Sequence, residues 1–138
     1  MKLAISLLLL LPLAIAVAQL PRTPSTEGAA VYIVSPADGA SVSSPVTVVF
    51  GLRGMGVAPA GVERPGTGHH HLLIDTPAPA LDRPIPADEH HRHFGGGQTE
   101  TTLKLEPGRH TLQLILADYL HIPHDPAVCS ERITITVE

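Results

Sequence analysis

The sequence predicts an all-β protein, a single antiparallel immunoglobulin-like sandwich preceded by an N-terminal signal peptide. Two observations indicate the sandwich: short runs of alternating apolar residues recur along the chain, and 12 Gly and 14 Pro punctuate the stretches between them. Alternation places every second side chain on one face of a strand, and several such strands separated by turn residues are typical of a two-sheet fold. Beyond the first 18 residues, no stretch has the period of a helix.

The first 18 residues have the three parts of an export signal. Lys2 supplies the positive charge, an apolar run follows from Leu3 to Val17, and Ala16 and Ala18 form a small-x-small cleavage site. The run is shorter than the ~20 residues of a membrane-spanning helix. We therefore expect cleavage after Ala18, a periplasmic or secreted location, and no membrane contact after cleavage.

The rest of the chain is expected to form one domain. Residues 19–29 lack periodicity and are expected to be a flexible lead-in, and residues 30–138 are expected to be a His-rich β-sandwich domain with a single core. Pro107 and Gly108 separate two alternating segments, which predicts a hairpin. The expected strands cover residues 31–34, 46–52, 69–75, 99–105, 109–117 and 131–137.

Charge and cysteine content exclude some functions. The net charge of the whole chain is −4, and no basic stripe occurs, so nucleic acid is not expected as a partner. Cys129 is the only cysteine, so no intramolecular disulfide can form. It shares the odd-numbered phase of Ile133 and Ile135, which predicts a buried, poorly reactive thiol.

Several motifs rich in Gly and His follow one another along the domain. They are Gly51–Gly61, Gly68–Asp75, His93–Glu100, Pro107–Leu114 and Asp118–His124. In this order they resemble an exported bacterial family, domain of unknown function 4399, over residues 30–138. The family has no established chemistry, so the resemblance implies a relative without implying an activity.

The nine histidines are clustered, and this favours a metal site. Imidazole is a good ligand for copper and zinc. His-x-His occurs both on an expected strand and in the following loop, and alternate strand residues share a face and can reach one ion. The predicted ligands are His69, His71, His91, His93, His121 and His124, with Asp75, Asp88, Asp118 or Asp125 as further ligands or supporting groups.

Strand alternation assigns the remaining histidines to structural roles. His70 shares a face with Leu72 and Ile74, which predicts that it points into the core as a hydrogen-bonded, buried group. His110 shares its phase with Leu112 and Leu114, so it is expected to be hydrogen-bonded at the rim of the core and not to bind metal.

These observations favour a non-catalytic, periplasmic metal-binding or metal-handling module for copper or zinc. Copper has a slight preference because imidazole sites bind it more tightly in the affinity series. One alternative is an immunoglobulin-like interaction or structural module of the cell envelope, with an envelope protein as its partner and no metal. The other is a small copper or zinc redox enzyme, since the His-x-His strand is similar to copper-zinc superoxide dismutases. No Gly-x-Ser-x-Gly or other catalytic motif is present, and no catalytic residues are predicted.

Overall fold

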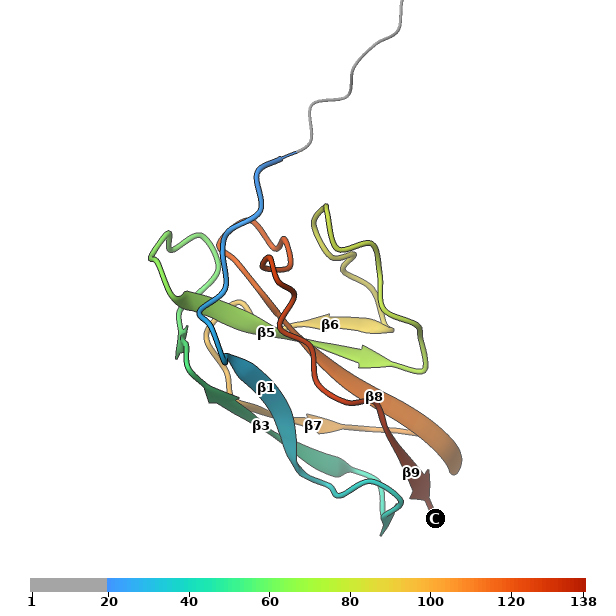
Figure 1. Cartoon of the computed structure of the whole chain (residues 1–138). Helices are drawn as coiled ribbons and strands as arrows, with labels where there is room; N and C mark the ends of the chain where they lie inside the picture. The colour runs from blue at the N-terminus through green and yellow to red at the C-terminus, as the bar shows by residue number, and fades with distance from the viewer. Residues whose placement is uncertain (1–19) are drawn as a thin grey trace, which may run out of the picture.

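A computed structural model describes residues 20–138, and the expected signal peptide, residues 1–18, lies outside them. Within the described part of the chain, every element of regular secondary structure is a β-strand, and the strands form two sheets (Figure 1). The predicted all-β, two-sheet architecture is confirmed. No described segment is a helix long and apolar enough to cross a membrane. The strands are β1 (Ala30–Ser35), β2 (Ser41–Val42), β3 (Val46–Arg53), β4 (Gly56–Val57), β5 (Thr67–Ile74), β6 (His91–His93), β7 (Glu100–Leu103), β8 (Gly108–Ala117) and β9 (Ile133–Val137).

The two sheets differ in size and in strand direction. The smaller has the order β1-β3-β7 and is antiparallel throughout. The larger has the order β2-β9-β8-β5-β4, and β6 pairs with β5 beside β4. Its long pairs, β5–β8 and β8–β9, are antiparallel, whereas the short β2–β9 and β4–β5 pairs are parallel. Strand β5 therefore has partners along both edges, which fixes its position in the sheet.

The predicted hairpin between the fourth and fifth expected strands is wrong. Strand β7 pairs with β3 in the smaller sheet, and β8 lies in the larger one, so the chain around Pro107 crosses from one sheet to the other. Leu103 of β7 pairs with Val46 and is buried. Alternation specifies which face of a strand is buried but not its partner, and a turn sequence fits either connection.

The main core lies between the two sheets. Val48 and Phe50 of the smaller sheet face Leu72, Leu114 and other side chains of the larger sheet, and all of these are buried. Each such side chain contributes about 1.5–3 kcal/mol through removal of apolar surface from water. This core holds β5 and β8 in register and so sets where the histidines of β5 project.

Strand β5 is buried on both faces. Its inner face places Leu72 and Ile74 in the main core, as predicted. On its outer face Leu73 forms a second apolar cluster with Ile115, Ala117 and Ile85. Because Ile85 comes from the segment between β5 and β6, that segment covers part of the outer face. Outward-pointing side chains of β5 are consequently shielded from solvent.

The predicted burial of Cys129 is wrong, because the residue is exposed. Partial burial of its thiol nevertheless raises the pKa of that group. Its neighbours Val128 and Ser130 are buried instead. Strand β9 begins only at Ile133, and Cys129 forms an isolated bridge with Ile115. The chain between 129 and 133 is irregular, so the alternation of β9 does not extend back to the cysteine.

Part of the expected lead-in packs against the domain. Pro24 forms a parallel bridge with Asp125. The Ser25 N–H donates to the Asp125 carbonyl at 3.1 Å, and the Asp125 N–H donates to the Thr23 carbonyl at 3.0 Å. We refer to residues 22–25 as the N-terminal strap.

Candidate metal centre

Four histidines from three segments converge at one edge of the larger sheet. They offer ring nitrogens that all lie within 4.8 Å of one another. His69 Nε2 lies 3.1 Å from His121 Nδ1 and 3.0 Å from His71 Nε2. The rings of His93 and His121 also contact, with centroids 4.7 Å apart. We refer to His69, His71, His93 and His121 as the four-His cluster.

The sheet itself positions three of these four side chains. His69 and His71 alternate onto the outer face of β5, opposite His70. In the antiparallel β5–β6 pair, His71 lies directly across from His93, and directly opposed residues have side chains close enough to touch. The short strand β6 therefore adds a third imidazole to the pair on β5.

The fourth histidine is carried by a tight loop after β8. Asp118 closes this loop: its Oδ1 accepts hydrogen bonds from the N–H groups of Leu120 at 2.9 Å and Ile122 at 3.0 Å. The Asp118 carbonyl accepts from the His121 N–H at 2.9 Å. His121 has a φ of 65°, a backbone conformation that residues other than Gly rarely adopt. The Ile85 N–H also donates to the His121 carbonyl at 2.9 Å, so the loop is fixed from two sides.

Burial differs across the cluster. His69 and His71 are 0% and 2% exposed, whereas His121 is half-buried and His93 is exposed. The site is therefore closed toward the sheet and accessible from the side of β6.

Burial and mutual repulsion keep the inner imidazoles neutral. Burial, together with the charges of His121 and His93, lowers the pKa of His69 to about 4, and the Asp118 carboxylate opposes this shift. Burial and the charges of the other cluster histidines lower the pKa of His71 to about 2. The pKa of His93 is also lowered, chiefly by burial. Neutral imidazole is the form that binds metal ions.

Hydrogen bonding alone cannot satisfy the inner nitrogens. A neutral imidazole has one N–H donor and one acceptor nitrogen. His69 Nε2 faces both His71 Nε2 and His121 Nδ1, while the Nδ1 atoms of His69 and His71 are buried without a partner among the described residues. Whichever tautomer His69 adopts, one of its buried nitrogens lacks a partner. Convergent lone pairs on neutral imidazoles suit a cation, so this donor set fits a metal ion.

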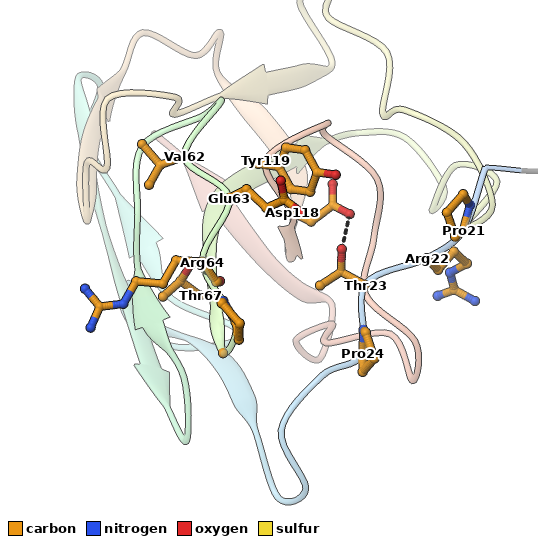
Figure 2. Close-up of a pocket in the computed structure, with 12 residues that line it drawn as sticks. Pro21, Arg22, Thr23, Pro24, Val62, Glu63, Arg64, Thr67, Asp118 and Tyr119 are labelled. Carbon is orange, nitrogen blue, oxygen red and sulfur yellow. Dashed lines mark hydrogen bonds between the residues drawn. The ribbon is translucent and has the colours of Figure 1, made fainter.

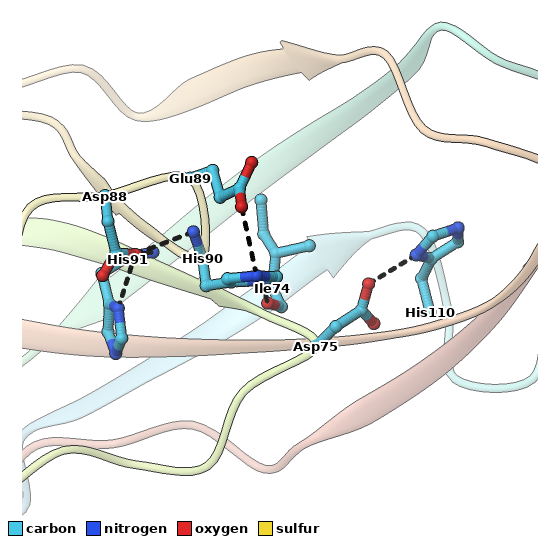
Figure 3. A network of polar contacts seen from close by, with 7 residues as sticks. All are labelled: Ile74, Asp75, Asp88, Glu89, His90, His91 and His110. Atoms are coloured by element: carbon cyan, nitrogen blue, oxygen red, sulfur yellow. Dashed lines mark hydrogen bonds and ion pairs between the residues drawn. The ribbon is translucent and has the colours of Figure 1, made fainter.

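Two of the predicted ligands lie outside the cluster. The His91 ring contacts the Asp88 carboxylate, with Nδ1 2.8 Å from Oδ1 (Figure 3). His124 is fully buried, and its ring nitrogens face backbone carbonyls, that of Thr67 at 3.1 Å and that of Leu116 at 3.4 Å. His124 thus links the start of β5 to the end of β8. Its ring nitrogens face these carbonyls and do not point toward the four-His cluster.

The predicted acidic ligands also have other partners. Asp75 Oδ2 lies 2.7 Å from His110 Nδ1 (Figure 3). The His110 Nε2–H donates to the Glu106 carbonyl at 2.8 Å. The hydrogen-bonded role predicted for His110 is confirmed, and the hydrogen bond to Asp75 raises the pKa of His110. Asp125 forms an ion pair with Arg22 at 3.3 Å.

His70 faces the core as predicted, but the expectation that it is hydrogen-bonded is wrong. It is 1% exposed, and neither ring nitrogen has a partner among the described residues. Its ring packs against Phe50, with centroids 5.2 Å apart. Burial lowers the pKa of His70, an effect that the nearby Gln98 backbone partly offsets.

Two residues that support the cluster were not identified from the sequence. A Cβ added to Gly95 would lie 2.3 Å from His93 Cε1, so this glycine leaves the space that the His93 ring occupies. The Thr23 hydroxyl donates to Asp118 Oδ2 at 2.7 Å. The Gly95–Gly97 run was a visible signal for the first, whereas nothing local to Thr23 marks it as a neighbour of residue 118.

Comparisons with known proteins place the cluster inside a family domain. The profile of a domain of unknown function (DUF4399) matches residues 48–138, a range that includes all four cluster histidines. No curated protein and no solved structure matched the chain.

Proposed function

This chain belongs to the DUF4399 family of domains of unknown function, and we propose that it is a non-catalytic metal-binding module that holds one copper or zinc ion in the four-His cluster. The observation that carries the proposal is the convergence of four ligand nitrogens within 4.8 Å, two of them on fully buried imidazoles. The convergent atoms include His69 Nε2, His71 Nε2 and His121 Nδ1, which face one another at 3.0–3.1 Å. A bound cation would accept the lone pairs of these convergent nitrogens, which neutral imidazoles cannot all satisfy by bonding to one another.

The charge of Asp118 also supports a cation at this site. Its side chain is 2% exposed and accepts hydrogen bonds only from uncharged groups, namely Thr23, Leu120 and Ile122. Among the described residues, none forms an ion pair with it. Buried carboxylates are normally paired or close to a metal. A divalent ion bound by neutral imidazoles would compensate this charge, since Asp118 acts electrostatically on His69.

The donor set favours copper or zinc over other ions. All four ligands are imidazoles, which suit Zn and Cu, whereas Mg and Ca prefer oxygen. Cys129 is not in the cluster, so a thiolate-ligated copper centre does not fit. Four protein ligands complete a tetrahedral zinc site, which favours binding or transfer of the ion over hydrolysis at an open coordination position.

The compartment and the finer fold class are part of the proposal. The export signal expected in residues 1–18 supports a periplasmic or secreted location. An all-imidazole site is suited to a compartment in which metal ions are not bound by an excess of reduced thiols. Two mostly antiparallel sheets packed around one core support an immunoglobulin-like sandwich.

Calorimetric titration of the untagged protein with Cu(II) and Zn(II) tests this function. We expect one ion per chain with a Kd below about 1 μM. His93→Ala should weaken binding at least about 10-fold, because it removes one ligand. His91→Ala is the matched control: it lies on the same short strand, but its ring contacts Asp88 and not the cluster. It should leave the affinity unchanged.

Three results would contradict the proposal. Failure to bind either ion more tightly than about 1 μM would favour an envelope interaction module without metal. Equal effects of His91→Ala and His93→Ala would indicate that the ion binds a dispersed histidine surface. Superoxide turnover by the copper-loaded protein would contradict the non-catalytic assignment.

A further inference from the structure

We propose that the N-terminal strap is a positioning element of the metal site: through the bond from Thr23 to Asp118, it holds the loop that carries His121 in ligating geometry. This inference rests on the proposed function, since it concerns the affinity of the same site. The strap lies outside the segment matched by the family profile, which begins at residue 48.

The strap contacts the loop region along its length. The Arg22 guanidinium donates to the carbonyls of Pro123 and His124 and forms an ion pair with Asp125 at 3.3 Å. Backbone hydrogen bonds join Asp125 to Thr23 and Ser25. The strap thus runs beside residues 123–125, immediately after the ligand histidine.

Thr23 connects the strap to the residue that shapes the loop. Its hydroxyl donates to Asp118 Oδ2 at 2.7 Å (Figure 2). The other oxygen of the same carboxylate holds the N–H groups on both sides of His121, those of Leu120 and Ile122. Rotation of the carboxylate would disturb both bonds. The Thr23 hydroxyl opposes that rotation, so it fixes the orientation of the group that fixes His121.

The strap has few competing contacts on its other side. A pocket of about 390 Å³ lies between residues 21–24, which include most of the strap, and the segment 62–67, with Asp118 and Tyr119 also in its lining (Figure 2). The strap is therefore held mainly by the 118–125 region. A change in the strap should act on this region and leave the sheets, which carry the other ligands, in place.

Double-mutant analysis of the full chain tests the inference, with Cu(II) and Zn(II) as the ions. Thr23→Val removes the hydroxyl at similar size, and we expect about 10-fold weaker binding, the lower end of the effect of groups that orient metal ligands. Thr23→Ser keeps the hydroxyl and should restore the affinity. In a His121→Ala background Thr23→Val should have no further effect, because the two changes act through one ligand. The copper complex of Thr23→Val should also show an altered electron paramagnetic resonance spectrum.

Thr102→Val is the matched control. Thr102 also has a hydroxyl contact, to Thr47 at 3.4 Å, but it lies in the smaller sheet. It should leave affinity and spectrum unchanged. If His93→Ala weakens binding, two results would overturn this inference. One is an unchanged metal affinity for Thr23→Val, and the other is an equal loss of affinity from Thr23→Val in the presence and absence of His121. Absence of binding by the unmodified protein would instead overturn the proposed function.

Discussion

Replacing His70 by leucine should stabilise the protein. The His70 ring is 1% exposed, both nitrogens lack partners, and Phe50 packs against it. A buried polar group without a partner costs about 1–3 kcal/mol. Leucine has a similar volume, and repacking after such an exchange costs under about 1.5 kcal/mol. After the repacking cost is subtracted, we expect His70→Leu to raise the free energy of unfolding by up to about 3 kcal/mol, and to leave metal affinity unchanged because residue 70 points away from the cluster.

Urea denaturation followed by circular dichroism, with a chelator present, measures this difference. The folded-state pKa of His70 is lowered, so the unfolded chain takes up more protons below about pH 6.5. The advantage of His70→Leu should therefore grow as the pH falls through that value. His70→Ala is the comparison, since its cavity should make it about 2–5 kcal/mol less stable than His70→Leu. Destabilisation by His70→Leu at both pH 7.5 and pH 5.5 would refute the reasoning and indicate that the imidazole has partners in solution.

Three further outcomes are expected. Without metal, the free energy of unfolding should fall as the pH drops below about 6.5, because the folded-state pKa values of His69 and His71 are about 4 and about 2. The loss should be roughly 2 kcal/mol at pH 5 for each of these residues. Denaturation at several pH values with a chelator checks this, and no change between pH 7 and 5 would contradict it. Gly95→Ala should displace the His93 ring and weaken Zn(II) binding in calorimetry, with a small change in melting temperature. His110→Gln should destabilise most at low pH, because the raised pKa of His110 adds stability below about pH 6.5 that is lost as the pH rises through the folded-state value; a larger effect at pH 9 than at pH 5.5 would contradict this.

Much of the fold could be predicted because alternation depends on one strand at a time. The inner and outer faces of β5 follow from residues 70, 72 and 74 alone, and the structure confirms them. The partner of a strand is not encoded in this way. β7 pairs with β3, distant in sequence, and the turn at Pro107 did not distinguish this arrangement from a hairpin. Strands as short as β2 and β4, each of two residues, have no alternation to detect.

The candidate site could be predicted only in part, for the same reason. His69 and His71 share a face by alternation, and their convergence needs no knowledge of the fold. His91 and His93 have the same His-x-His spacing as His69 and His71, yet only His93 joins the cluster. The register of β6 places His93 opposite His71 and places His91 opposite Leu73. Register depends on the covering segment between β5 and β6, whose irregular sequence gives no periodic signal.

The choice between His121 and His124 shows how backbone conformation decides ligand identity. The two residues are separated by two positions and both follow β8, so spacing favours neither. Asp118 closes a loop in which His121 adopts a φ of 65°, which directs its ring to His69. Past this turn the chain bridges back to β8 through Pro123 and Ala117, and His124 is directed to the carbonyls of Thr67 and Leu116. A single carboxylate therefore separates the ligand from the structural histidine, and the bond from Thr23 to this carboxylate acts on the side of the ligand, whereas Arg22 holds the backbone of His124.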